Sequence, residues 1–216
     1  MKMKKVTIII AVIMATTAVN AQHTDHPTTK STSKSIKSSK YLEFNQAMRK
    51  LWSDHMHWTL ATVDAFFNEP KQLETKLNRL LQNQKEIGAA IVPFYGQAAG
   101  DKLAKLLTEH IELAVPVLKA AQGNDKATLD AALTNWYKNA NDIAGFLSSA
   151  NPKNWPHTAT EPALKMHITH TTEYAVNILK GNYASSITGF EQALNHMLML
   201  ADILTEGIAK QFPDKF

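Results

Sequence analysis

The sequence predicts an all-α fold, a bundle of about six helices arranged as three repeated antiparallel hairpins. Apolar residues recur at helical spacing along nearly all of the chain after residue 40, for example at Leu103, Leu107 and Ile111. No segment shows sustained alternation of apolar and polar residues between hairpin turns, so no strand is expected. Turns rich in proline, glycine and asparagine then divide the chain into its elements.

The first 21 residues have the layout of a signal peptide. Lysines precede an apolar run from Val6 to Val19, and small residues lead up to Ala21. This run is shorter than the roughly 20 residues that span a bilayer, so we expect cleavage after Ala21, no stable membrane span afterwards, and a periplasmic or secreted protein. An uncleaved N-terminal anchor is the alternative.

Residues 22–40 are rich in serine, threonine and lysine and are expected to form a disordered tether.

The remaining segment, residues 41–216, is long enough for a single helical-bundle domain with its own core. Seven of the 23 basic residues and one of the 19 acidic residues precede it, which leaves 16 bases against 18 acids. Without a basic excess to neutralise phosphates, nucleic acid is not an expected partner. The chain contains no cysteine, which excludes disulfides, thiolate metal ligands and cysteine nucleophiles. The sequence does not indicate a protein or small-molecule partner.

Turn-forming residues divide the chain into six expected helices. The breaks are Pro70, the loop 93–100, the turn 123–125, the loop 150–162 and the turn 181–182. The expected helices span residues 41–68, 71–92, 101–122, 126–149, 162–180 and 184–211.

Consecutive helices form hairpins that can be superimposed as a threefold repeat with a period of 56 to 60 residues. The segments beginning LWSDH, LLTEH and ALKMH each carry a histidine at the same place. About thirty residues later each histidine is followed by an acid, within NQKEI, NANDI and LMLADI. In an antiparallel hairpin, residues equally distant from the turn lie at one level. Each histidine and its acid meet this condition, so we expect one layer of three imidazoles and three carboxylates. Its members are His55, Glu86, His110, Asp142, His167 and Asp202.

A second polar layer is expected closer to the last turn. His170 competes with His167 for the third place in the main layer, but its distance from the turn matches Asp202 less well. His170 is instead level with His196, and Met199 follows His196 by one turn. These three residues are secondary candidates for metal ligands.

Neutral imidazoles and carboxylates together are typical ligands of iron, manganese, zinc or copper, and helical bundles often hold such sites between facing helices. We therefore predict a transition-metal site. The first alternative is that each His-carboxylate pair is a buried structural brace, because a buried imidazole N–H needs an acceptor. A proton-handling site is the second. A third is an enzyme with a substrate pocket at the bundle end near Tyr95 and Trp155.

Four runs carry a resemblance to a known family: LLQNQKEIGAAIVPFYG, DKLAKLLTEHIELA, NWYKNANDIAGFLSSANP and HMLMLADILTEGIAKQFPDKF. Over almost all of residues 45–216 the chain resembles small uncharacterised helical proteins of bacteria that are sometimes labelled glycosyltransferase. The resemblance implies a helical fold and a third histidine at His167. The chain itself has no D-x-D motif, glycine-rich phosphate loop or alternating βα pattern, the features typical of nucleotide-sugar sites.

Overall fold

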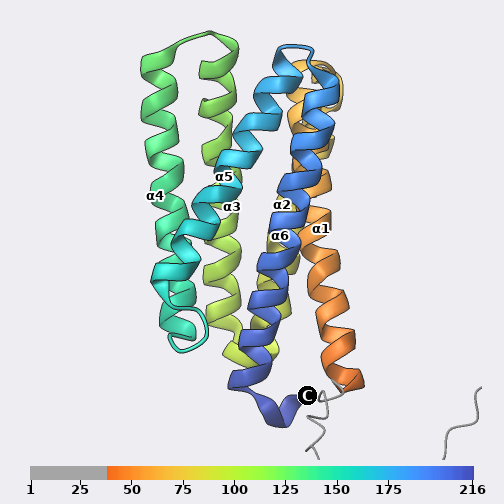
Figure 1. The fold of residues 1–216 in the computed structure, drawn as a ribbon, viewed down its shortest axis with the longest axis vertical. Helices are drawn as coiled ribbons and strands as arrows, with labels where there is room; N and C mark the ends of the chain where they lie inside the picture. Colours follow the sequence, from red (N-terminus) through yellow and green to blue (C-terminus); the bar gives the residue numbers. More distant parts are fainter. Residues whose placement is uncertain (1–37) are drawn as a thin grey trace, which may run out of the picture. The chain divides into compact units, whose positions relative to one another are not determined.

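The computed structural model describes residues 38–216 as an all-α bundle of six helices (Figure 1). The helices are α1 (Ser39–Phe67), α2 (Leu73–Tyr95), α3 (Gln97–Gln122), α4 (Lys126–Ala150), α5 (His157–Leu179) and α6 (Tyr183–Gln211), with 3₁₀ turns at Pro70–Gln72 and Pro213–Lys215. The predicted signal peptide, and the tether up to residue 37, lie outside the described residues. Ser39 and Lys40, which were assigned to the tether, already belong to α1.

Local chemistry explains the helix ends. The Ser38 side chain accepts a hydrogen bond from the Tyr41 N–H and caps α1, and Asp125 caps α4 in the same way. The predicted loop over 93–100 is wrong, because only Gly96 leaves helical geometry there, with a φ of +83° that favours glycine. The predicted loop over 150–162 is also too long, because α5 begins at His157, directly after Pro156, and continues through Pro162.

The helices run alternately up and down and close into a ring. Each helix packs against the next one in the sequence, and α6 packs against α1. Figure 1 shows α5 crossing the bundle obliquely, and it also contacts α1 and α3. As a result α1, α3 and α5, which all run in the same direction, meet in the interior. The contact between α2 and α3 is the most extensive of all, so the division into three repeated hairpins stays a prediction.

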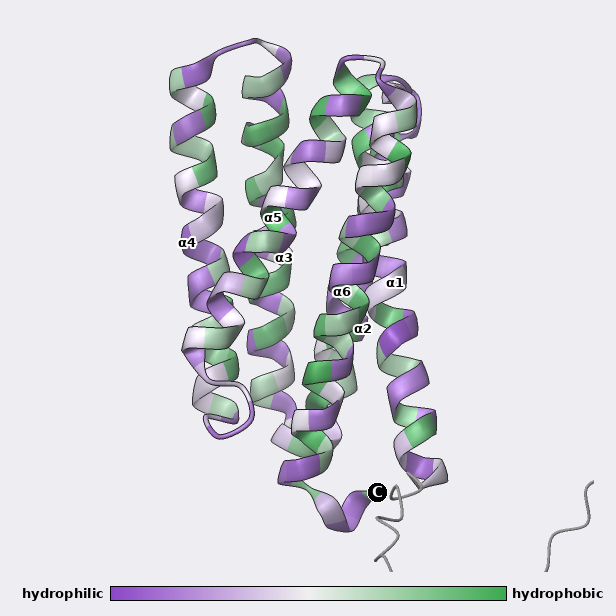
Figure 2. Cartoon of the chain, in the orientation of Figure 1, coloured by the Kyte–Doolittle hydropathy of each residue, from purple (hydrophilic) through white to green (hydrophobic). Residues whose placement is uncertain are grey.

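The core lies along the inner faces of all six helices, and hydrophobic and hydrophilic residues alternate along each ribbon in Figure 2. Helices α2 and α3 approach so closely at Gly88 and Gly100 that a Cβ on Gly88 would lie 2.5 Å from the Gly100 carbonyl oxygen. Between residues 38 and 216, none of the helices combines the length and hydrophobicity needed to cross a bilayer.

Candidate functional site

Three histidines meet in the middle of the bundle. His55 of α1, His110 of α3 and His167 of α5 are each at most 3 % exposed. The Nε2 atoms of His55 and His167 lie 3.5 Å apart, and the His110 ring stacks on His167 with centroids separated by 5.7 Å. The structure therefore brings together the three histidines that the repeat selected, with His167 rather than His170 in the third place.

The hydrogen bonds of His110 define where its proton lies. The Asn139 amide donates through Nδ2 to the Leu106 carbonyl, so its Oδ1 is the atom that faces His110 Nδ1 at 2.8 Å. Because a carbonyl oxygen only accepts, Nδ1 carries the hydrogen. The Nε2 atom of the neutral ring then holds a lone pair, and it is buried without a hydrogen-bond partner. A second hydrogen bond that fixes a histidine tautomer in this way is typical of metal-ligating histidines.

His55 has the opposite arrangement. The Gln84 amide donates through Nε2 to the Leu80 carbonyl at 2.8 Å, and the same nitrogen lies 3.3 Å from His55 Nδ1. Nδ1 therefore accepts, and His55 Nε2 carries a hydrogen that points to His167 Nε2. Two buried atoms beside this contact have no partner, Gln84 Oε1 and His167 Nδ1. Turning the Gln84 amide over would move the His55 hydrogen to Nδ1 and free its Nε2.

One hydrogen bond recurs between α1 and α2, between α3 and α4, and between α5 and α6. The carbonyl four residues before each histidine accepts from a side chain of the following helix. Asn83 donates to Leu51 at 3.1 Å and Asn139 donates to Leu106 at 3.1 Å. Between α5 and α6, His196 takes this role, donating through Nε2 to the Ala163 carbonyl at 2.8 Å. This shared bond sets the level at which each histidine sits.

Burial keeps the three rings neutral. Desolvation lowers the pKa of His55 to about 3, with a smaller contribution from the charge of His110. It lowers the pKa of His110 to about 4, although the bond to Asn139 opposes this shift. The pKa of His167 is also held well below its usual value, chiefly by burial and then by the neighbouring histidines. Near pH 7 all three rings are in the deprotonated form that binds metals.

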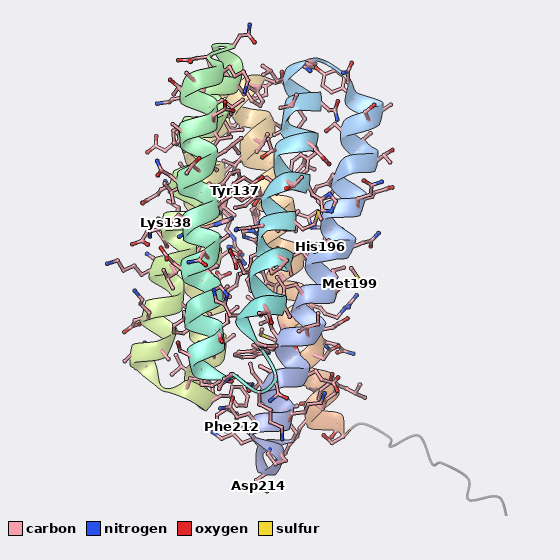
Figure 3. All side chains as sticks on the ribbon, turned by 60° about the vertical axis from the view of Figure 1, so that its left-hand side comes forward. Tyr137, Lys138, His196, Met199, Phe212 and Asp214 are labelled. Carbon is pink, nitrogen blue, oxygen red and sulfur yellow. The ribbon has the colours of Figure 1, made fainter. Side chains whose placement is uncertain are left out.

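The three predicted carboxylates do not join the histidines, so this part of the expected layer is wrong. Glu86 pairs with Arg79 at 3.2 Å, Asp142 with Lys138 at 2.7 Å, and Asp202 with Arg49 at 2.6 Å. Figure 3 shows Lys138 projecting away from the bundle. Glu86 and Asp142 lie one turn beyond the inward-facing Asn83 and Asn139 and about 60° round the helix. This small rotation places them at the surface, where an ionised carboxylate keeps its water.

The secondary candidates divide in a similar way. His170 and His196 face each other with ring centroids 5.6 Å apart, as their distances from the turn predicted. Met199 is 59 % exposed and projects outward from α6 (Figure 3). It is therefore not part of this layer. In the segments NQKEI, NANDI and LMLADI, Met199 stands three residues before its acid, as Asn83 and Asn139 do, but the shared hydrogen bond shows that His196 is their counterpart.

The histidine cluster opens into a cavity of about 210 Å³ that is lined by residues of α1, α2, α3, α4 and α5. All three histidines line it, and most of the other lining side chains are apolar. Between residues 38 and 216, no three histidine, aspartate or glutamate side chains are already arranged to hold a metal ion. His110 stacks on His167 with an angle of 23° between the ring planes, so a shared ion would require these rings to rearrange.

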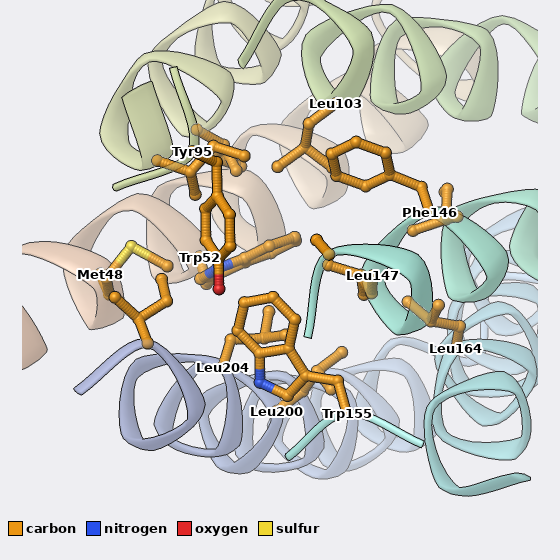
Figure 4. Close-up of a pocket in the computed structure, with 15 residues that line it drawn as sticks. Met48, Trp52, Tyr95, Leu103, Phe146, Leu147, Trp155, Leu164, Leu200 and Leu204 are labelled. Atoms are coloured by element: carbon orange, nitrogen blue, oxygen red, sulfur yellow. The ribbon is translucent and has the colours of Figure 1, made fainter. Parts of the chain in front are cut away.

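The pocket expected near Tyr95 and Trp155 is filled. Figure 4 shows Trp52, Tyr95 and Trp155 crowded together there, and the remaining space is about 20 Å³, the scale of one water molecule. The Trp155 indole is 2 % exposed and packs directly on Gly207. Tyr95 donates a hydrogen bond to Gln211 at 2.6 Å. These aromatic rings close the bundle end, and the expectation of a substrate pocket there is wrong.

Sequence reasoning missed Gln84, Trp136 and Thr171 as members of the site. Gln84 directly follows Asn83, and Thr171 follows His167 by one turn, the spacing that also relates Thr59 to His55. That repeated spacing was the available signal for Thr171.

Comparisons with protein-family models, with curated proteins and with solved structures find no match for this chain. The resemblance to a bacterial helical family therefore stays a prediction, and what the chain does must be argued from the histidine cluster and its cavity.

Proposed function

We propose that this protein binds one divalent transition-metal ion through the imidazoles of His55, His110 and His167. The observation that carries the proposal is the meeting of three buried, neutral imidazoles: His55 and His167 contact each other through Nε2, and His110 Nε2 has no hydrogen-bond partner. Two imidazole nitrogens bound tetrahedrally to one zinc ion lie about 3.4 Å apart, since each bond is about 2.0 to 2.1 Å. The two Nε2 atoms of His55 and His167 are 3.5 Å apart.

Three imidazoles leave a fourth coordination position open. This arrangement is typical of zinc sites that bind water or substrate, whereas structural zinc sites are closed by four protein ligands. The open position would face the cavity, because all three histidines line it. With the carboxylates at the surface, the donor set favours zinc or copper over manganese. If the predicted signal peptide is cleaved, this metal-binding protein works outside the cytoplasm.

The competing reading is a structural brace. The contact between His55 and His167 and the bond between His110 and Asn139 already join four helices without any ion. A brace needs no further ligand, but it does not account for the partnerless His110 Nε2, since an unsatisfied buried acceptor costs about 1 to 3 kcal/mol.

The test is titration with Zn²⁺ by calorimetry, together with metal content by mass spectrometry. Wild-type protein should bind one Zn²⁺ per chain. His55→Gln, His110→Gln and His167→Gln should each weaken binding at least a hundredfold while the helical circular dichroism persists. His57→Gln is the matched control, because this exposed histidine lies two residues from His55 and forms hydrogen bonds with Ser53, one turn earlier on the same helix. Asp142→Ala should also retain full binding.

If the wild-type protein took up no Zn²⁺, the proposal would be wrong and the histidines would be a structural brace. Uptake that survives all three substitutions would also contradict it. In that case the metal would be held elsewhere, for instance by His23 and His26, which lie outside the described residues and are unchanged in every variant.

A further inference from the structure

The cavity beside the histidines runs from the middle of the bundle toward one end. Phe66 near the end of α1 and Leu73 at the start of α2 both line it, so it extends toward the α1–α2 connection (Figure 1). Phe66 follows His55 by eleven residues, which is about 16 Å at the helical rise. Phe66 and Leu73 are partly exposed, and Lys119 of α3, which also lines the cavity, is exposed. The outer end of the cavity therefore lies close to the surface.

The walls of this cavity are mostly apolar. Thr59 and Thr62 line it, but each hydroxyl donates to the carbonyl four residues earlier in α1, at 2.7 Å. The buried hydroxyl of Thr171 has no hydrogen-bond partner. Aliphatic and aromatic side chains of α1, α2 and α3 form most of the remaining lining, among them Val63, Phe66, Leu77, Leu80, Ile111 and Leu118. A ligand would thus be held chiefly by apolar contact.

The lining offers no buried charge to an ionic ligand. Burial lowers the pKa of all three site histidines, so near pH 7 their rings are neutral. Among the described residues that line the cavity, Lys119 is the one that carries a charge at this pH, and an exposed lysine keeps its ammonium group in water. An ion that entered would lose its hydration without a counter-charge. The cavity therefore selects neutral molecules.

The size of the cavity sets the size of the ligand. At the other end of the bundle, near Tyr95 and Trp155, the remaining space is only about 20 Å³, so the core is not loosely packed throughout. Native cores contain few voids larger than a water molecule, and a cavity of about 210 Å³ calls for an occupant. An apolar cavity of about 150 Å³ binds benzene, and on the same scale this one accommodates about eight non-hydrogen atoms.

We propose that this cavity binds a small, neutral, apolar molecule of the size and class of an alkylbenzene, between the histidines and the α1–α2 connection. The apolar walls remove such a ligand from water, which is the main source of its binding free energy. The inference does not depend on the proposed metal site, because the walls and not an ion hold the ligand.

The test uses fluorine NMR on metal-free protein in the presence of a chelator. The probe is 4-fluorotoluene, which has eight non-hydrogen atoms, and its charged counterpart is 4-fluorobenzoate. We expect 4-fluorotoluene to bind one site per chain and 4-fluorobenzoate to bind at least tenfold more weakly, because the carboxylate would have to lose its hydration. Titration with Zn²⁺ is scored separately, so either proposal can fail while the other stands.

A cavity-filling variant locates the site. Ala114 lines the cavity, so Ala114→Leu should weaken 4-fluorotoluene about tenfold, the effect of a moderate steric clash. Ala131→Leu is the matched control, because Ala131 is exposed on α4 and does not line the cavity. It should bind the probe as the wild type does.

Nuclear Overhauser effects locate the probe without any variant. In the wild-type protein, the protons of 4-fluorotoluene should contact the methyl groups of Leu77, Ile111 and Leu118, which line the cavity. Contacts with Leu133 and Val176 instead would place the probe in the surface groove between α4 and α5 and would overturn the inference. The absence of 4-fluorotoluene binding, equal affinity for 4-fluorobenzoate, or unchanged binding in a folded Ala114→Leu protein would each overturn it as well.

Discussion

At the residue scale, the amides beside the histidines decide which ring nitrogen is available. Asn139 presents an oxygen to His110, whereas Gln84 presents a nitrogen to His55. For the metal to bind both rings through Nε2, the Gln84 amide must turn over so that its oxygen accepts from His55. The state of Gln84 therefore sets part of the cost of binding.

Replacing Gln84 with glutamate removes the need to turn this side chain over before the metal binds. A carboxylate can only accept, so Gln84→Glu should hold the His55 hydrogen on Nδ1 and direct the Nε2 lone pair at the metal. Second hydrogen bonds of this kind change metal affinity about 10- to 100-fold, so we expect Zn²⁺ to bind about tenfold more tightly in calorimetry. Gln82→Glu, at an exposed position of the same helix, is the control. Weaker binding in Gln84→Glu would contradict this role.

The burial of the site histidines predicts that the metal-free fold is sensitive to acid. The pKa values of His55 and His110 are about 3 and about 4 in the folded chain, against about 6.5 in the unfolded chain. Between those limits only the unfolded chain takes up protons, so this stability is complete above pH 6.5 and is lost as the pH falls. At pH 5 each of these two histidines lowers the free energy of unfolding by about 2 kcal/mol.

Urea unfolding at pH 7.5 and pH 5.0 measures this loss. His110→Gln removes one titrating group, so the variant should lose about 2 kcal/mol less than the wild type between the two pH values. If the two proteins lost the same free energy, the imidazole would not be titrating as a buried group.

At the element scale, the close crossing of α2 and α3 depends on two glycines. A Cβ on Gly88 would lie 2.5 Å from the Gly100 carbonyl oxygen and 2.8 Å from the Ala104 Cβ. Neither neighbour can move without shifting a helix. Because α2 carries Gln84 and α3 carries His110, this crossing also fixes the width of the cavity between them.

Gly88→Ala should therefore destabilise the protein by about 1 to 3 kcal/mol, the usual cost of overpacking. Gly145→Ala on α4 is the matched control. A Cβ there would meet nothing within 4 Å, so the higher helix propensity of alanine should stabilise the fold by up to about 1 kcal/mol. Thermal unfolding of both variants measures the difference, and equal effects would show that the crossing is not tight.

At the scale of the whole molecule, the oblique path of α5 makes the site. By crossing the ring of helices, α5 brings His167 against histidines of α1 and α3, which are far away in the sequence. A metal ion held there would join three helices that otherwise meet through side-chain packing and through the contact between His55 and His167. Binding should then stabilise the entire cooperative unit.

The expected increase in the free energy of unfolding follows from mass action. Free Zn²⁺ at a hundred times its dissociation constant adds about 2.7 kcal/mol, which raises the unfolding temperature of a domain of this size by roughly 5 to 11 °C. Differential scanning calorimetry with and without Zn²⁺ measures the shift. His167→Gln should show no shift, and a wild-type protein that melts at the same temperature in both conditions would argue for the brace.

The sequence by itself determined the helical fold, five of the six helix starts to within four residues, and the common level of His55, His110 and His167. Spacing from the turns carries this information, because helical rise and antiparallel pairing are regular. Only the tertiary structure decided that Gln84 and Asn139, rather than Glu86 and Asp142, face His55 and His110, and that Asp202 pairs with Arg49 instead of with His167. Asn139 and Asp142, for example, differ by one turn and about 60° of rotation, which is finer than a distance from a turn can resolve.

The cavity was likewise beyond reach of the sequence. Its volume depends on how six helices pack, on the close approach at Gly88 and on the tilt of α5, and each of these arises from contacts between distant segments. The filled pocket at Tyr95 and Trp155 illustrates the same point. Aromatic residues at a bundle end either line a space or fill it, and packing decides which, because the outcome depends on the volume left by all of their neighbours.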